Sequence, residues 1–302
     1  MAEKKNKGFE YARSVKSDFS DELINSYFLR PIAGVLVRVF YPTPITPNQL
    51  TVAAILVGAC AALFYSIGEY RTTIIAGVLI TLKDLLDSAD GQLARAKNLF
   101  SRRGRFIDSI GDFVVDLLVF IAITLSLYRV EPASHIIFLG LAGVIGITLR
   151  VSYHVFYHVS YLHLEDQYQT NRLIEEIREE DRHGDPVALR LQQIFLFIYS
   201  WQDKLMYGID EWSKSARGHS PYEQQEFFER LWYSDRVGLR FSGLLGLGTE
   251  LALLTVCSLL NELSLYLWLN LLLMNGIWLV SILYRKLHLA PSLLRLSTSR
   301  TK

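Results

Sequence analysis

The sequence predicts an all-α, polytopic membrane protein with six transmembrane helices, an N-terminal interfacial amphipathic helix before them, and a helical cytoplasmic insertion between the fourth and fifth. Two observations predict this class. Hydrophobic residues make up 51% of the 302 residues, above the usual share in soluble domains, and they gather in runs long enough to span a bilayer. Acidic residues also lie among these runs, where charge is costly and usually functional.

Charge and cysteine content bound the other possibilities. The chain has 31 Lys and Arg against 30 Asp and Glu, a net charge of +1, which gives no reason to expect a nucleic-acid partner. Cys60 and Cys257 both lie in apolar runs, so we expect no structural disulfide. Residues 1–19 are polar and lack a signal-peptide core, and we expect them to form a cytosolic tail.

The interfacial helix is expected from Ser20 to Phe40. Its apolar residues recur at helical spacing, but Arg30 and Arg38 interrupt them, and Pro31 should kink or divide the helix. The stripe is therefore too interrupted to span a bilayer, and it favours a helix lying on the membrane surface. A soluble core helix is the alternative interpretation.

A clear helix start opens the first predicted span. Thr46 is a typical N-cap, Pro47 suits the first helical position, and Gln49 completes a capping box. We expect the span from Gln49 to Ile67, where Ala and Gly residues would let neighbouring helices approach closely.

The second span begins near Thr72, but its clean apolar run ends before Lys83. That run, Thr72 to Leu82, has 11 residues. At ~1.5 Å per residue it covers roughly half of a ~30 Å hydrocarbon core. The helix must therefore continue through the acids beyond Lys83. We expect these acids to line a polar cavity at membrane depth rather than face lipid.

The remaining elements follow from apolar runs and charge. A basic turn over 96–105 is expected on the cytoplasmic side by the positive-inside rule. The other four spans are expected at about Phe106–Tyr128, Ser134–Val159, Val237–Leu260 and Leu263–Tyr284, with a basic tail from Arg285. Residues 161–235 would form a cytoplasmic amphipathic insertion, so that residues 20–160 and 236–302 make one membrane domain.

The most specific pattern in the chain runs from Asp87 to Asp112. It reads D-x2-D-G-x2-A-R-x8-G-x3-D-x3-D, and its four acids are Asp87, Asp90, Asp108 and Asp112. Spacings of three and four place each pair on one helix face, and the intervening turn would bring the two helices together. Such an oxygen-rich site suits Mg²⁺ or Mn²⁺.

At all eight named positions the pattern resembles the signature of the CDP-alcohol phosphotransferase family, also called CDP-alcohol phosphatidyltransferases. The helix start Pro47–Thr51 is also common in that family. The resemblance implies that Asp87, Asp90, Asp108 and Asp112 bind two Mg²⁺ or Mn²⁺ ions and that Asp112 is the general base. It further implies a six-helix bundle, often a homodimer. The reaction would transfer a phosphoalcohol group, commonly phosphatidyl from CDP-diacylglycerol, to an acceptor hydroxyl and release CMP.

The resemblance also implies a set of nucleotide-binding residues: Asp87, Gly91, Ala94, Arg95 and Gly104. Small side chains at Gly91 and Ala94 would leave room for the cytidine nucleotide, although close helix packing explains either one alone nearly as well. Arg95 would bind the diphosphate, since a guanidinium suits phosphate oxygens; a juxtamembrane anchor is the alternative. Gly104 would relax the turn or let the third span approach the nucleotide.

Some charged residues lie outside the pattern. Asp84 and Asp116 extend the two acidic faces by one turn, and they could pair with Lys83 or Arg150, orient metal ligands, or contact the acceptor. Arg150 also belongs, with Arg236 and Arg240, to a basic group near the cytoplasmic ends of the fourth and fifth spans. That group could hold a phosphorylated acceptor or simply anchor the helices.

His154 and His158 are four residues apart at the end of the fourth span, a spacing that could bind zinc. The flanking tyrosines favour a membrane-boundary belt instead.

Two rival functions remain to be tested. Membrane prenyltransferases also hold Mg²⁺-diphosphate with helical aspartates, but they lack the Asp-Gly-x2-Ala-Arg run. A non-catalytic membrane scaffold, using the insertion for partners, would tolerate loss of the acids. The expected location is an integral multi-pass membrane protein with its active site facing the cytoplasm, and the pattern fixes neither the acceptor alcohol nor the CDP-linked donor.

Overall fold

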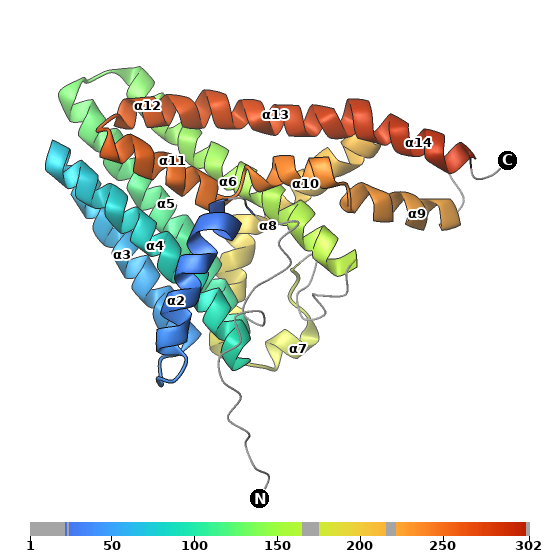
Figure 1. The fold of residues 1–302 in the computed structure, drawn as a ribbon, viewed down its shortest axis with the longest axis horizontal. Helices are drawn as coiled ribbons and strands as arrows, with labels where there is room; N and C mark the ends of the chain where they lie inside the picture. The colour runs from blue at the N-terminus through green and yellow to red at the C-terminus, as the bar shows by residue number, and fades with distance from the viewer. Residues whose placement is uncertain (1–21, 23, 165–174, 216–221, 300–302) are drawn as a thin grey trace, which may run out of the picture.

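The structure is a computed structural model that describes residue 22 and residues 24–164, 175–215 and 222–299. Every regular element in these ranges is a helix (Figure 1). The tail predicted over residues 1–19 lies outside the described residues, as do residues 165–174 and 216–221 of the predicted insertion. The predicted all-α class is therefore confirmed for the part of the chain that the structure describes.

The predicted N-terminal helix is present in two parts. A π-helical turn, η1 (Asn25–Leu29), leads into α2 (Arg30–Phe40), and the change falls at Pro31, where the first turn of a helix tolerates a missing N–H. Ala33 and Val37 are fully buried against the helices that follow. Ile32, Val35 and Val39 are exposed on the opposite face, as is Arg38. Such an outer face suits contact with lipid.

Three long helices lie side by side and form the first half of the bundle (Figure 1): α3 (Pro47–Ile67), α4 (Tyr70–Lys97) and α5 (Arg102–Val130). The capping box predicted at the start of α3 is confirmed. The Thr46 N–H donates to Gln49 Oε1 at 2.9 Å, and Thr46 Oγ1 accepts the Gln49 N–H at 3.4 Å.

A short turn and small residues hold these three helices together. α4 ends at Asn98, which adopts a left-handed φ of 55°, and Ser101 caps α5 by accepting the Gly104 N–H at 2.9 Å. A Cβ added at Gly111 would lie 2.2 Å from Ile55 Cδ1, so α3 and α5 need a residue without a side chain there. Both α4 and α5 are thereby packed against α3.

The predicted insertion supplies a helix that packs on this bundle. α6 (Ser134–Leu164) continues past its predicted end, and a short α7 (Glu179–Arg182) precedes α8 (Pro186–Lys214). α8 lies against α5 and α6: the Phe195 and Phe106 ring centroids are 5.4 Å apart. The insertion is therefore helical, and part of it covers the first turns of α5.

The last part of the chain departs from the predicted pair of regular spans. α9 (Tyr222–Tyr233) precedes α10 (Arg236–Gly243) and α11 (Leu247–Leu259), which bend by 42° where one span was expected. The remaining helices follow one another in a single rod (Figure 1): α12 (Leu263–Trp268), η3 (Leu269–Met274), α13 (Asn275–Tyr284), η4 (Arg285–Leu289) and α14 (Ala290–Ser299). The segment expected to be a basic tail is thus helical through Ser299.

Two buried contacts explain these departures. The carboxylate of Glu22 accepts the Gly248 N–H at 2.7 Å, and a Cβ added at Gly246 would lie 2.1 Å from Glu22 Cδ, so the side chain fills the bend before α11. The guanidinium of Arg285 is fully buried, with its carbon 3.6 Å from the centroid of the Tyr157 ring. This cation–π contact secures the helix beyond the predicted end of the last span.

The structure describes four helices that are long and apolar enough to cross a membrane: Pro47–Ile67, Arg102–Val130, Ser134–Leu164 and Leu263–Leu296. A fifth is obtained if the bent pair α10 and α11 counts as one span. α4 has 28 residues, about 42 Å of helix, but it carries Lys83 and three aspartates. Several helices of this length and apolar character are typical of a multi-pass membrane protein.

Candidate active site

Three aspartates of the predicted metal site converge between α4 and α5. Asp87 and Asp90 of α4 and Asp108 of α5 each offer a carboxylate oxygen, and these oxygens lie within 4.8 Å of one another. Oδ1 of Asp108 is buried and has no hydrogen-bond donor. Bringing carboxylates together without donors is costly unless a cation joins them, and all-oxygen ligand sets suit Mg²⁺ or Mn²⁺. The residues therefore fit a divalent ion.

Asp90 is oriented by a residue on a third helix. Thr51, in the first turns of α3, donates its hydroxyl to Asp90 Oδ2, and both residues are buried. The sequence indicated only that Pro47–Thr51 starts a helix. A contact between helices depends on how each helix is rotated, which the local pattern does not reveal.

Asp112 is not part of this three-oxygen group. Its Oδ1 atom instead forms an ion pair with the Nζ atom of Lys83, one turn before Asp87 on α4. Lys83 is 1% exposed, whereas the Asp112 side chain is 21% exposed. The sequence pattern suggested Lys83 as a partner for Asp84 or Asp116, whereas the structure pairs it with Asp112.

The site carries a large excess of negative charge. Lys83 interacts electrostatically with Asp112, Asp87, Asp84 and Asp116, and Asp90 and Asp108 complete the cluster. Six aspartates thus surround one lysine, and Asp84 and Asp90 are less than 10% exposed. Such an imbalance in a poorly solvated site calls for additional cations.

The predicted nucleotide residues occupy the ends of α4 and α5 that face the turn. A Cβ added at Gly91 would meet only the Arg95 guanidinium, at 3.5 Å, so Arg95 extends over open space beside Gly91. Ala94 is half-buried on the same helix. A Cβ added at Gly104 would lie 2.4 Å from Asn48 Oδ1, so Gly104 is needed for the approach of α5 to the start of α3.

The three arginines proposed for the acceptor lie in different surroundings. Arg150 is fully buried: it pairs with Glu250 and donates to Asn275 Oδ1 at 2.7 Å. Arg236 and Arg240 are exposed on α10. The structure therefore groups Arg236 with Arg240 but separates Arg150 from them by burial.

His154 and His158 stack with their ring centroids 5.6 Å apart, and both are buried. His154 Nε2 lies 3.9 Å from Glu22 Oε1. Burial, and then the charge of Asp84, raises the pKa of Glu22 to about 8. Among the described residues, three possible metal ligands converge in the aspartate trio, which does not include either histidine.

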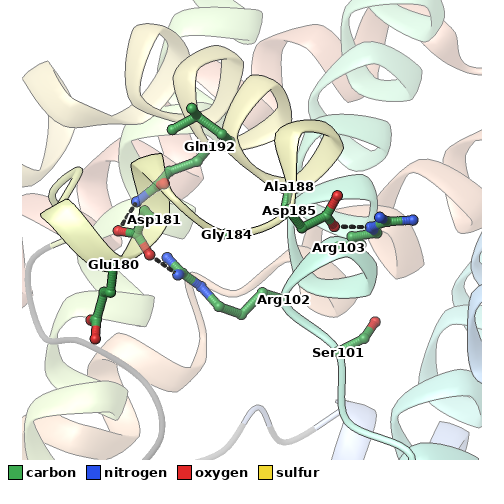
Figure 2. A pocket seen from close by; sticks show the side chains of 10 residues that line it. Ser101, Arg102, Arg103, Glu180, Asp181, Gly184, Asp185, Ala188 and Gln192 are labelled. Atoms are coloured by element: carbon green, nitrogen blue, oxygen red, sulfur yellow. Dashed lines mark hydrogen bonds and ion pairs between the residues drawn. The ribbon is translucent and has the colours of Figure 1, made fainter.

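A second charged cluster joins the basic turn to the insertion, and we call it the arginine clamp. It consists of Arg102, Arg103 and Arg105 of α5 with Glu175, Asp181 and Asp185. Figure 2 shows the Arg102–Asp181 and Arg103–Asp185 pairs across a pocket of about 310 Å³. Arg102 Nη2 also lies 2.8 Å from Glu175 Oε1, and Gln192 Nε2 donates to the same oxygen at 2.8 Å. The clamp fixes the insertion against the first turn of α5.

Comparison with known proteins agrees with this geometry. Over 86 residues the chain is 43% identical to a protein of Archaeoglobus fulgidus named bifunctional IPC transferase and DIPP synthase, covering 28% of this chain and 16% of that protein. It is 36% identical over 81 residues to archaetidylinositol phosphate synthase of Pyrococcus horikoshii, covering 27% and 42%. It is 37% identical over 91 residues to inner membrane protein YnjF of Escherichia coli, covering 30% and 42%. The chain thus spans less than half the length of each of these relatives.

The family comparison covers more of the chain. The model of the CDP-alcohol phosphatidyltransferase family matches residues 44–212, which is more than half of the 302 residues. The match begins just before α3 and ends near the end of α8, so it includes the aspartate trio, Lys83, Asp112 and most of the helical insertion. On the combined strength of this match and the converging aspartates, the chain belongs to the CDP-alcohol phosphatidyltransferase family.

Proposed function

We propose that the protein is an integral membrane enzyme that transfers a phosphoalcohol group from a CDP-alcohol to an acceptor hydroxyl and releases CMP. The observation that carries this proposal is the convergence of Asp87, Asp90 and Asp108, within the family's motif and one turn from Asp112. CDP-diacylglycerol is the proposed donor, so that the transferred group is phosphatidyl. α4 would be the sixth span, with its acids lining a polar cavity open to the cytoplasm.

Asp87, Asp90 and Asp108 would hold a first Mg²⁺ or Mn²⁺ ion, and Asp112 would share a second. The excess of five negative charges, six aspartates against Lys83, supports two divalent ions rather than one. When bound, such ions neutralise and polarise the phosphate oxygens at which charge develops.

Asp112 is the proposed general base. Lys83 occupies one of its carboxylate oxygens, which leaves the other to accept the proton of the acceptor hydroxyl. A bond then forms between the acceptor oxygen and the β-phosphorus, while the bond from that phosphorus to the CMP oxygen breaks. Arg95, beside the open space at Gly91, would bind the diphosphate through its guanidinium.

The acceptor is proposed to be a phosphorylated alcohol. The Pyrococcus relative is named for archaetidylinositol phosphate, and inositol phosphate is therefore the first candidate. The exposed Arg236 and Arg240 remain candidates to contact its phosphate, whereas the guanidinium of Arg150 is already engaged by Glu250. Asp84 and Asp116 would orient the metal ligands around Lys83. A homodimer is proposed from the family resemblance.

A CMP-release assay tests the proposal directly. Purified protein would be incubated with CDP-diacylglycerol, Mg²⁺ and a panel of acceptors: serine, glycerol 3-phosphate, inositol, inositol phosphate, choline and ethanolamine phosphate. CDP-choline and CDP-ethanolamine with diacylglycerol would complete the panel. CMP release with at least one acceptor is expected. Inorganic pyrophosphate as product would indicate a prenyltransferase instead, and CMP release that survives Asp108→Asn would contradict the assigned site.

A further inference from the structure

Lys83 has a placement that the family motif does not explain. It lies four residues before Asp87 and therefore on the same face of α4, yet it is outside the eight motif positions. Its ammonium contacts Asp112 Oδ1 and not the aspartate trio. A cation held among metal ligands normally weakens metal binding, so its presence requires a reason.

The surroundings of Lys83 hold its side chain in one position. The residue is 1% exposed, and a Cβ added at Gly58 of α3 would lie 3.3 Å from Lys83 Cγ and 2.5 Å from Val115 Cγ1. The stem thus passes through a gap between α3 and α5 that exists because residue 58 is glycine. A lysine fixed in this way delivers its charge to one place.

That place is one oxygen of the Asp112 carboxylate. A carboxylate near a divalent ion can bind it with both oxygens, and an aspartate bound in this way has no free oxygen to accept a proton. A fixed ammonium on Oδ1 prevents such bidentate binding and repels the nearby cation. Only Oδ2 then remains for the ion and the acceptor hydroxyl.

We propose that Lys83 is a positioning residue for Asp112: it holds one carboxylate oxygen and so keeps Asp112 working as a base instead of closing on a metal ion with both oxygens. The proposal rests on the proposed function for the role of Asp112. The change in metal affinity that the proposal predicts depends only on the geometry of Lys83 and the aspartates.

The decisive variant is Lys83→Met, which keeps the length of the stem and removes the charge. Titration of the purified protein with Mn²⁺, followed by electron paramagnetic resonance, should show the weaker ion binding about tenfold more tightly than in the wild type, equivalent to ~1.4 kcal/mol. In the CMP-release assay kcat should fall about a hundredfold, with KM for CDP-diacylglycerol unchanged. Lys83→Arg should restore part of kcat, because it returns a cation to the same oxygen.

Two further variants separate this role from a structural one. Lys204→Met removes an exposed lysine of α8 and should leave both Mn²⁺ affinity and kcat as in the wild type. In an Asp112→Asn background, Lys83→Met should cause no further loss of kcat, because the two residues act as a unit. Weaker Mn²⁺ binding in Lys83→Met, or unchanged Mn²⁺ binding and kcat, would overturn the proposal. A wild-type protein without CMP release would refute the proposed function, while the Mn²⁺ titration would still test Lys83.

Discussion

Two clusters of charge lie next to each other on α5, and they are built in opposite ways. In the arginine clamp, three arginines meet three acids, and the Arg102 and Arg103 side chains are 44% and 51% exposed. In the aspartate site, six acids surround Lys83, and two of them, Asp84 and Asp90, are buried. The clamp is balanced in charge and its arginines reach solvent, whereas the aspartate site has a large excess of negative charge.

The difference separates attachment from function. The buried Glu175 and Asp181 of the clamp are each paired with an arginine, so the clamp can hold the insertion without depending on any ligand. Salt should weaken those pairs that reach solvent. Buried like charges destabilise the fold unless something else is bound. Charge balance, more than the number of charged residues, therefore distinguishes the proposed metal site from the clamp.

The largest effect is expected at the aspartate trio. Asp108→Asn removes the carboxylate whose buried Oδ1 atom has no donor, so one ligand of the first ion is lost. We predict at least a thousandfold loss of kcat, of the order expected when a metal-assisted step loses its ion. Mn²⁺ titration should show loss of the tighter ion, and chelation of the wild type should abolish CMP release.

The matched control is Asp185→Asn, which makes the same chemical change in the clamp. It should retain CMP release within about threefold, because its partner Arg103 is exposed. A comparable loss of kcat in both variants would mean that the two clusters do not differ in function.

A smaller effect, on metal affinity, is expected at Thr51, which contacts the trio through Asp90. Thr51→Val removes the hydroxyl that donates to Asp90 Oδ2, and removing such supporting hydrogen bonds usually lowers metal affinity about 10- to 100-fold. Mn²⁺ affinity should fall by that amount. Thr81→Val, which removes a hydroxyl bonded to Gly77 O and Thr255 Oγ1 further up α4, should leave Mn²⁺ affinity unchanged.

The contacts that these variants address differ in how far the sequence could predict them. Residues close in sequence were predictable: the Thr46 capping box, the boundaries of α3, and the two pairs of motif acids all depend on local spacing. Thr51–Asp90 and Lys83–Asp112 cross between helices, so they depend on helix rotation that periodicity leaves undetermined.

The clamp and the bent span were still further from prediction. Glu175 lies 73 residues from Arg102, and the sequence indicated a basic turn and an amphipathic insertion without indicating that the two pair. The bend between α10 and α11 arises because Glu22, far away in sequence, fills the space at Gly246. Long-range contacts of this kind override a local apolar run that reads as one straight helix.

The clamp itself gives a prediction of moderate size. Arg102→Glu should place like charges beside Glu175 and Asp181, loosening the insertion and reducing kcat about two- to tenfold. Asp181→Arg combined with Arg102→Glu restores opposite charges across the pocket in Figure 2 and should recover most of the loss. CMP release measured in low and high salt should show that wild type approaches Arg102→Glu as salt screens the pairs. Failure of the double variant to recover would indicate that α8 is held by its apolar contacts alone.

The smallest expected effect is on the free energy of unfolding. Its pH dependence should differ between two aspartates of the insertion, Asp203 and Asp185. Burial, and then the charge of Glu175, raises the pKa of Asp203 to about 6 from its usual 3.8. The folded protein therefore binds the Asp203 proton more tightly than the unfolded chain, and stability falls as pH rises from about 4 to 6. Asp203→Asn should be more stable than wild type by about 1–2 kcal/mol above pH 6, after allowance for its partial exposure, and no different below pH 4.

Asp185 supplies the opposite sign in the same measurement. The hydrogen bond from Arg103 lowers the pKa of Asp185, so its contribution is present above the usual pKa and is lost as pH falls below it. Thermal unfolding of the detergent-solubilised protein at pH 2, 4, 6 and 8 should show Asp203→Asn gaining stability relative to wild type as pH rises from 4 to 8. Asp185→Asn should instead be less stable than wild type at pH 8 and approach it at the lowest pH. Parallel curves for the two variants would mean that burial, rather than the partner charge, governs both carboxylates.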